Sequence, residues 1–517
     1  MSALLARLAA MPAHPWGASV ARRRRGFVLS TSVATLALVA IAPLGEAFAQ
    51  VDTRYQAGMS VQVGVTDNVA QAPDVAEGDV NAVPPQADGL AVLSPSVALV
   101  FETANASHTL AYGFGATLYF MNSEANAYSN GLSYTSRFAL SPTVDLALGV
   151  GAAYTQTNAF NILAGANAVA VGLQPADAIE VISLTAAQGI EIALTDVWSM
   201  NQTASGTTLL QLSTETRNYL LGASVGATRE FTLDTFGMGV GADFLVQPAA
   251  DGVAGNNQLI LRATGTWTHA LSDQWSTTVA AGGVLANQVG QAIDAVGVPI
   301  PSTPVIQPYG LAAINFQDDF GTAGFSIEHN VTPNLLTGSA QLTDTATLRT
   351  GLPISDTGLL LAATGAAGTA RVLQIDGTFA EDVVLVFVAD AGLGYIVPAL
   401  PELTLDLRYQ FTKQTPADGA LSADAEIQAI TRNTVLLGAT MVWPPADAGG
   451  AAAAGTAPVF RPTPAGGQEI LGGVRDAREQ AAQEAEDQER RERRNGGRDT
   501  DGQYNGTRGG GGAAEDE

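Results

Sequence analysis

The residues of this chain that could do chemistry are charged side chains at alternate positions within otherwise apolar segments. In an extended segment, this spacing puts the charges on one face and the apolar side chains on the other. If the segments close into a barrel, the charged face points into the bore. There the charges either set the ion preference of a water-filled pore or pair with one another and fill the interior. We expect this inward position for Glu102, Arg137, Asp145, Asp243, Arg262, Glu328, Arg349, Asp406 and Arg408.

Residues that could build a catalytic or metal site are few. The chain has no cysteine and four histidines, and the three beyond residue 49 (His108, His269 and His329) show none of the spacings of metal ligands. No nucleophile elbow, phosphate-binding loop or dinucleotide-binding fingerprint stands in a usable context. We therefore expect no enzymatic activity, no cofactor and no metal. A hydrolase built from residues distant in sequence is a minor alternative.

Three segments show most clearly the elements that would position the charges. In residues 55–66, 109–120 and 403–412, apolar side chains alternate with polar or small ones, a period of two that a helix cannot separate into faces. Each segment is close to the roughly 9–11 residues that a tilted strand needs to cross a bilayer. The pattern predicts an all-β fold, a transmembrane antiparallel β-barrel, rather than a soluble sandwich.

The connections between these segments predict the number of strands. Short turns and mostly longer segments rich in Gly, Asn, Pro and Ala alternate along the chain, as periplasmic turns and outer loops do in membrane barrels. The turns are expected near 104–107, 141–143, 195–196, 230–235, 272–273, 317–320, 353–356 and 398–401, and the long loops near 68–89, 122–130, 159–178, 248–257, 289–305 and 414–432. This order predicts about 16–18 strands with both barrel ends in the periplasm. Between 331 and 382 the alternation is poor, which leaves 16 and 18 both open.

Tryptophan placement also favours a membrane barrel. Trp198, Trp267, Trp275 and Trp443 all stand beside predicted periplasmic turns or at the end of the last strand. Indole rings concentrate at membrane interfaces because the ring is apolar and its N–H needs a polar partner. We expect these four residues to belong to an aromatic girdle, and the alternative is core tryptophan in a soluble β-protein.

The first 49 residues have the three parts of a secretory signal peptide. A basic cluster at 22–25 precedes an apolar stretch at 26–43, and a small-residue site ends at Ala49, so cleavage is expected between Ala49 and Gln50. Beyond Gln50 no run of about 18 apolar residues appears, so strands would have to make any membrane spans. We expect residues 50–443 to form the barrel in the cell outer membrane, in contact with its lipid.

The end of the chain differs from that of an ordinary barrel. Gly438, Met441 and Trp443 of the last strand resemble the terminal signal that barrel-assembly machinery recognises, but that signal normally ends the chain. Residues 444–474 are expected to be a Pro/Ala/Gly-rich linker, and residues 475–517 a charged tail, partly helical and then disordered. The tail is either merely solvated or contacts a periplasmic partner or peptidoglycan.

The charge of the chain restricts its partners. The formal net charge is -25, and residues 50–443 hold 34 acidic and 10 basic side chains. Nucleic-acid binding depends on basic side chains that neutralise phosphates. We therefore expect no nucleic-acid partner.

The end of the first strand, Gly64-Val65-Thr66-Asp67-Asn68-Val69, resembles a motif of the outer-membrane β-barrel porin family. That family often ends its first strand in a Gly-Tyr-x-Asp-Asn type motif before a long loop, and here Val65 replaces the aromatic residue. The resemblance implies a porin-like channel for small hydrophilic solutes or ions. Members of such groups are often associated with envelope or exopolysaccharide systems. The alternatives are a non-conducting structural or docking barrel of the envelope and, less favoured, a secreted soluble β-rich adhesin.

Overall fold

A computed structural model describes most of the predicted barrel. The described residues are 52–69, 85–158, 178–248, 255–289, 292–293, 299–300, 303–318, 320–335, 337–354, 358–374, 378–381, 383–416 and 429–444. The chain divides into two units, residues 1–464 and 465–517. The predicted signal peptide with its cleavage site at Ala49, the linker from residue 445 onward and the whole second unit with the predicted tail lie outside the described residues.

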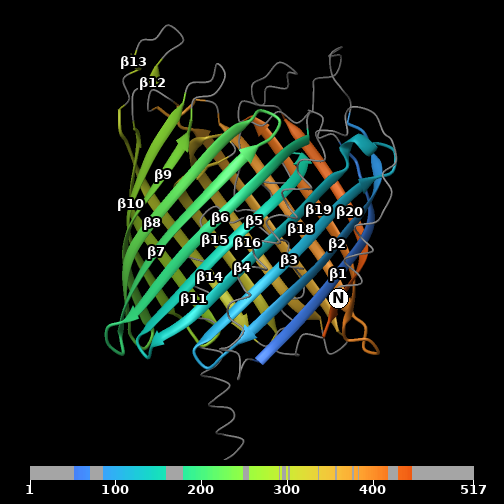
Figure 1. Ribbon diagram of the computed structural model, residues 1–517, viewed down its shortest axis with the longest axis horizontal. Coiled ribbons are helices and arrows are strands. Elements are labelled where there is room, and N and C mark those ends of the chain that lie inside the picture. Colours follow the sequence, from blue (N-terminus) through green and yellow to red (C-terminus); the bar gives the residue numbers. More distant parts are fainter. Residues whose placement is uncertain are drawn as a thin grey trace, which may run out of the picture. The chain divides into compact units, whose positions relative to one another are not determined.

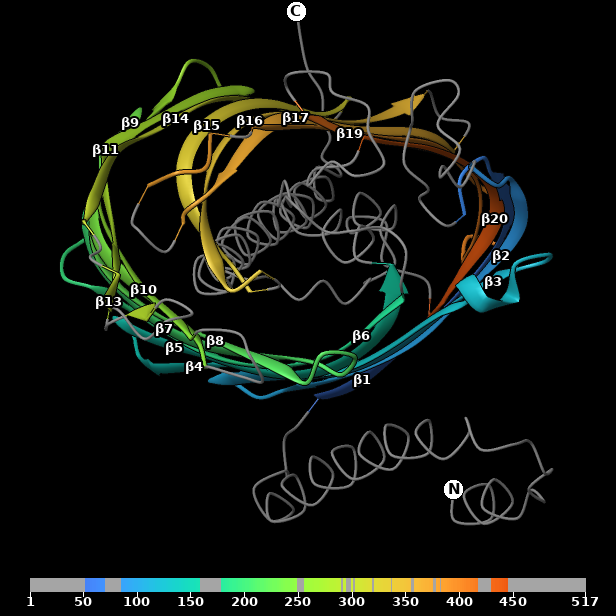
Figure 2. The ribbon, with the colours of Figure 1, turned by 90° about the horizontal axis from the view of Figure 1, so that it is seen from above.

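The described residues of the first unit form one closed antiparallel β-barrel of eighteen strands. Consecutive strands pair around the ring, and β1 pairs with both β2 and β20, which closes it (Figures 1 and 2). Two short segments, β12 (Ala292–Ile293) and β13 (Pro299–Ile300), pair separately. The strands of the wall are β1 (Asp52–Thr66), β2 (Asp88–Glu102), β3 (Ala106–Tyr119), β4 (Ala127–Ser141), β5 (Val144–Asn158), β6 (Ala178–Ala193), β7 (Trp198–Gln211), β8 (Thr216–Glu230), β9 (Asp234–Gln247), β10 (Asn256–Ala270), β11 (Trp275–Gln288), β14 (Val305–Asp318), β15 (Gly321–Asn334), β16 (Ser339–Ile354), β17 (Leu359–Val372), β18 (Val384–Ile396), β19 (Leu403–Pro416) and β20 (Ile430–Trp443).

Alternation along the strands gives the wall its two faces. In β1, the apolar side chains of Val63 and Val65 are 51% and 59% exposed, whereas Ser60 and Thr66 on the other face are 8% and 2% exposed. Large apolar side chains stay exposed in the same way on strands all around the ring. An exposed apolar belt on a closed barrel is the surface that meets lipid. No helix among the described residues is long and apolar enough to cross a membrane.

The two ends of the barrel differ as the sequence predicts. The predicted short turns all join strands at one end, here called the turn end, and the predicted long connections join strands at the other, the loop end. β1 begins and β20 ends at the turn end, so both barrel ends lie on the same side. The strand count is the upper value of the predicted range.

The region of poor alternation forms strands that leave the wall. β14 and β15 stop pairing at Gly310 and His329, but β15 and β16 continue as a hairpin to Asn334 and Ser339. We call residues 330–343 the inner hairpin, because these ends of β15 and β16 bend inside the ring of the other strands (Figure 2). The pair Val331 and Leu342 lies on an apolar face of the hairpin and the pair Thr332 and Gln341 on a polar one, so the hairpin itself keeps the alternation of a strand. Its apolar face packs against the wall of the bore instead of facing lipid.

Candidate functional site: the bore and its inner hairpin

The inner face of the wall is identified by contacts with the inner hairpin. Asn256, Gln258 and Arg262 of β10 all bond to it, so the even-numbered side of β10 faces the bore. Paired residues on adjacent strands project to the same side of the wall. The pairing of each strand with the next therefore identifies the inward-facing residues of every strand in the ring. Among the described residues the inner face holds nine acidic and six arginine side chains, namely Asp88, Glu102, Asp145, Glu191, Glu230, Asp243, Glu328, Asp390, Asp406, Arg54, Arg137, Arg262, Arg349, Arg408 and Arg432.

All nine charged residues selected from the sequence have this inward register. Six further residues share it and were not selected, of which Asp390 has the most consequence because it pairs with the predicted Arg408. The same alternation, applied to every strand rather than to the clearest ones, would have found them. In β18, however, Asp390 follows Val384, Val386 and Val388 on one face, so polarity did not distinguish the inner face there.

Some of these charges form ion pairs between adjacent strands of the wall. Arg408 bonds Asp390 on the adjacent strand, with both Oδ atoms within 2.8 Å of its Nε. On β9 and β10, Asp243 and Arg262 approach to 3.2 Å. Near the turn end, Arg54 and Glu102 of β1 and β2 also approach to 3.2 Å.

Neutral amides extend these pairs into polar patches. The Gln62 side chain donates to Asp406 (2.7 Å), and Gln410 donates to Asp390 (3.0 Å). Below the hairpin, Asn330 donates to Glu328 (2.9 Å). The walls of the bore therefore carry charges of both signs with local partners.

The remaining predicted residues lie elsewhere on the inner face. Arg137 and Asp145 lie near the turn end of β4 and β5, and Arg349 lies on β16 opposite Gly324 of β15.

The inner hairpin is held against the wall by three amides. Asn218 of β8 donates through Nδ2 to the Leu335 carbonyl, and Asn256 donates to the Gly338 carbonyl at 3.1 Å. Gln258 accepts the Ala340 N–H through Oε1 at 2.6 Å. Deeper in the bore, the Arg262 guanidinium donates to the Val331 carbonyl at 3.0 Å. The wall thus binds the hairpin backbone as it would bind a strand-like ligand.

Apolar side chains pack beside these bonds. Val331 and Leu342 of the hairpin cluster with Ile260 and Val284 of the wall, and Leu373, after β17, joins them. Full burial of such a side chain contributes roughly 1.5–3 kcal/mol. The hairpin therefore narrows the bore on the β8–β11 side.

Each of the three wall amides forms a hydrogen bond to the hairpin through only one of its two polar side-chain atoms. Asn218 Oδ1, Asn256 Oδ1 and Gln258 Nε2 are buried without a hydrogen-bond partner, and these residues are 1%, 4% and 0% exposed. A buried polar atom that lacks a partner costs about 1–3 kcal/mol. The contact between hairpin and wall is thus less favourable than its packing alone indicates.

The first-strand motif lies at the seam between the first and last strands. Asp67 accepts hydrogen bonds from the backbone and side-chain nitrogens of Asn433 at 2.7 and 2.6 Å. Asn68, which is fully buried, donates to the Thr431 carbonyl, and Thr66 donates to the Asn433 carbonyl. In this structure the motif joins β1 to β20 at the loop end.

The four tryptophans lie on the outer face at the turn end. Trp198 and Trp275 begin β7 and β11, and Trp443 ends β20, where its ring lies 5.2 Å from that of Tyr55. Trp267 donates its indole N–H to Asp234 at 2.9 Å. This placement is compatible with an interfacial girdle, a role that stays a prediction.

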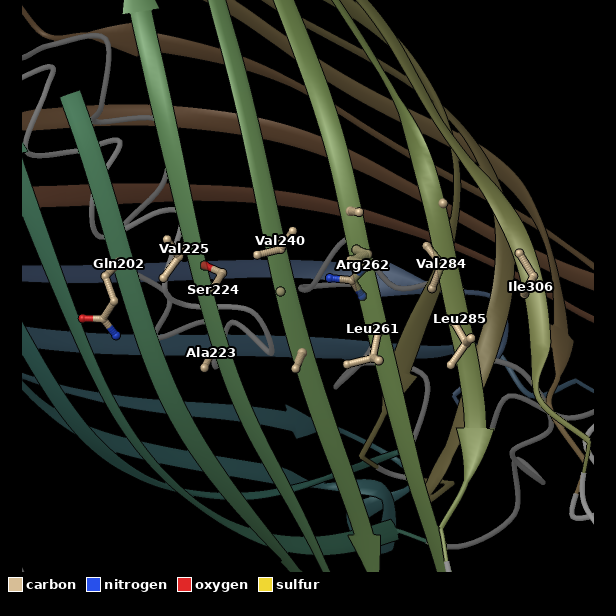
Figure 3. Close-up of a pocket in the computed structure, with 14 residues that line it drawn as sticks. Gln202, Ala223, Ser224, Val225, Val240, Leu261, Arg262, Val284, Leu285 and Ile306 are labelled. Atoms are coloured by element: carbon tan, nitrogen blue, oxygen red, sulfur yellow. The ribbon is translucent and has the colours of Figure 1, made fainter. Parts of the chain in front are cut away.

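A shallow hollow also lies on the outer face, across β7 to β14 (Figure 3). Small side chains such as Ala223, Ala242 and Ala263 line it, together with larger apolar ones such as Leu261 and Ile306. All of these belong to the outward register, so the hollow is part of the apolar belt rather than of the bore. Within the part of the chain that the structure describes, no cluster of three His, Asp or Glu side chains could hold a metal ion.

The apolar outer belt and the polar bore together decide the class of this molecule. It is an outer-membrane β-barrel. No protein-family model matches the chain, and no curated protein matches it either.

Solved structures with a similar fold include an iron transporter and outer-membrane receptors. The FrpB iron transporter of Neisseria meningitidis has 9% identity and a TM-score of 0.41 over 76% of this chain and 83% of that one. The alcaligin receptor FauA of Bordetella pertussis has 10% identity and a TM-score of 0.40 over 75% and 76%. The ferric-catecholate import receptor Fiu of E. coli K12 has 10% identity and a TM-score of 0.39 over 75% and 82%. At these values the function has to be argued from the bore itself.

Proposed function

We propose that this protein is a porin-like channel that admits small hydrophilic solutes or ions across the outer membrane. The observation that supports this most directly is the closed eighteen-strand wall with charged and amide side chains on its inner face. A barrel of this strand number is wide enough for an aqueous passage unless protein segments fill it. The inner hairpin fills part of this bore, so passage is expected on the side lined by β18, β19, β20 and β1.

Conductance of the purified full-length protein in planar bilayers tests the channel. We expect discrete openings in KCl. Replacing residues 331–342 by a two-glycine turn between Asn330 and Thr343, which pair across the hairpin, should give larger openings. A protein that stays silent both as the natural chain and without the hairpin is not a channel.

The second candidate is a non-conducting docking barrel of the envelope. The inner hairpin favours it, because the apolar cluster of Val331 and Leu342 with the wall occupies part of the bore permanently if it never moves. Under this alternative the loops or the predicted tail bind an envelope partner or peptidoglycan. Removal of residues 445–517 would then release co-purifying envelope components, whereas a channel would keep its conductance after the same truncation.

A further inference from the structure

The wall beneath the inner hairpin has the chemistry of a binding surface. Asn218, Asn256 and Gln258 lie on the inner face of β8 and β10, and the hairpin meets them mainly with backbone groups, the carbonyls of Leu335 and Gly338 and the N–H of Ala340. Backbone carbonyls and N–H groups are generic acceptors and donors. A solute that presents hydroxyl or amide groups in a similar arrangement would satisfy the same three side chains.

The unpartnered polar atoms of these amides indicate that the docked hairpin does not satisfy all of their hydrogen-bonding capacity. Each of the three has one end bonded to the hairpin and the other buried without a partner. Buried polar groups in proteins are normally paired, so a set of unpartnered ends in one contact calls for a physical reason. A state in which the two surfaces separate and meet water or solute supplies this reason.

The hairpin has a free edge along which it could separate. β15 loses its wall neighbour after the Gly310–His329 pair, and from there to Asn334 it pairs with β16 alone. On the other side β16 stays paired with β17 as far as Gln341 and Val372. Lifting the hairpin would therefore break its contacts with β8, β10 and β11 and bend the end of β17, without breaking a ladder of the barrel wall.

The three amides bear no charge. The guanidinium that meets the hairpin deeper in the bore, that of Arg262, is paired with Asp243. Such a surface favours an uncharged solute, because an ion would lose its water shell without gaining an opposite charge.

We propose that Asn218, Asn256 and Gln258 form a binding site for a small uncharged solute rich in hydroxyl or amide groups, and that the inner hairpin occupies this site in the closed state and lifts to admit the solute. This inference rests on the proposed channel function and adds to it a solute class and a gate.

A disulfide between hairpin and wall tests the gate. Ser339 Oγ and Asn256 Nδ2 are 3.2 Å apart, and the chain has no cysteine, so the double variant S339C/N256C can form only the intended bond. When oxidised, the variant should lose the larger openings in bilayers, and a reductant should restore them. Because N256C also removes one amide of the site, glucose uptake by proteoliposomes is compared only between the oxidised and the reduced form of this variant, and the reduced form should take up more. The control is S60C/T440C, which links two paired residues of the inner wall at the seam without touching the hairpin.

Block of single-channel current by glucose tests the site, because it is measured only while the channel is open. Q258L should raise the glucose concentration for half block by about three- to tenfold, the effect of one lost hydrogen bond. Q410L, an amide of the opposite wall, should leave it unchanged.

The outcomes separate the two levels of the proposal. Equal glucose uptake by oxidised and reduced S339C/N256C, with the disulfide verified by mass spectrometry, overturns the gate. Equal block in the natural chain and Q258L overturns the site. Absence of current in every variant contradicts the channel function itself.

Discussion

At the scale of single residues, the buried asparagine of the first-strand motif stabilises barrel closure. Asn68 is fully buried, and its amide donates to the Thr431 carbonyl of the neighbouring last strand. N68A removes this hydrogen bond. We expect a loss of about 1–3 kcal/mol in unfolding free energy. The measurement is the temperature at which the detergent-solubilised barrel loses its compact migration in gels. N130A, in a strand far from the seam, should shift this temperature much less.

The Arg408–Asp390 pair is expected to affect selectivity more than stability. Its side chains are 34% and 27% exposed to the bore, so water screens them, and removal of the arginine should cost less than about 1 kcal/mol. R408M leaves Asp390 and Asp406 without the nearby cation. The reversal potential in a KCl gradient should then move toward the potassium equilibrium potential. R229M, which removes an arginine from the outer face of β8 where its guanidinium lies over the Trp198 ring, is the matched control. A shift of the same size in both variants would contradict a local effect in the bore.

At the scale of elements, the inner hairpin depends on its turn. Gly338 has φ +66°, and a Cβ there would lie 2.6 Å from the Gln247 side chain. G338A should destabilise the docked hairpin by roughly 1–2 kcal/mol, the cost of a left-handed conformation for a residue with a Cβ. Limited proteolysis should cut the variant near the turn sooner, while the barrel unfolds at an unchanged temperature. G365A is the control, because its Cβ meets only the Val388 carbonyl, at 3.9 Å. Equal protection of the hairpin in both variants would disprove the role of the turn.

At the scale of the whole molecule, the charges on the inner face predict a moderate cation preference. Nine carboxylates and six arginines share the inward register among the described residues. The carboxylates outnumber the arginines by three, which favours cations in the bore. Reversal potentials should show cation preference at 0.1 M KCl and little at 1 M, because the screening length falls from about 10 Å to about 3 Å. Anion preference at low salt would contradict the inward assignment of the acidic residues.

Much of the barrel follows from the sequence because strand alternation is a local property. A residue in a strand of the wall faces either lipid or the bore, and the two environments select opposite side chains, so segments such as 55–66 and 403–412 show their faces directly. The turns are equally local, which is why their positions and the shared side of the two barrel ends could be predicted. The inward register of the nine charged residues follows from the same rule.

The tertiary structure alone decided how the bore is used. The hairpin strands alternate as strands of the wall do, so no local pattern shows that they bend inside the ring or which part of the wall their apolar face will cover. The amides Asn218 and Gln258 lie 40 residues apart and meet the hairpin only because β8 and β10 are neighbours across one strand. The role of Asn68 at the seam also required β20 to lie beside β1. The sequence by itself determined a polar-lined membrane barrel, through the period of its strands. The structure determined the partners of each inward side chain, because ring closure brings together residues that are distant in the chain.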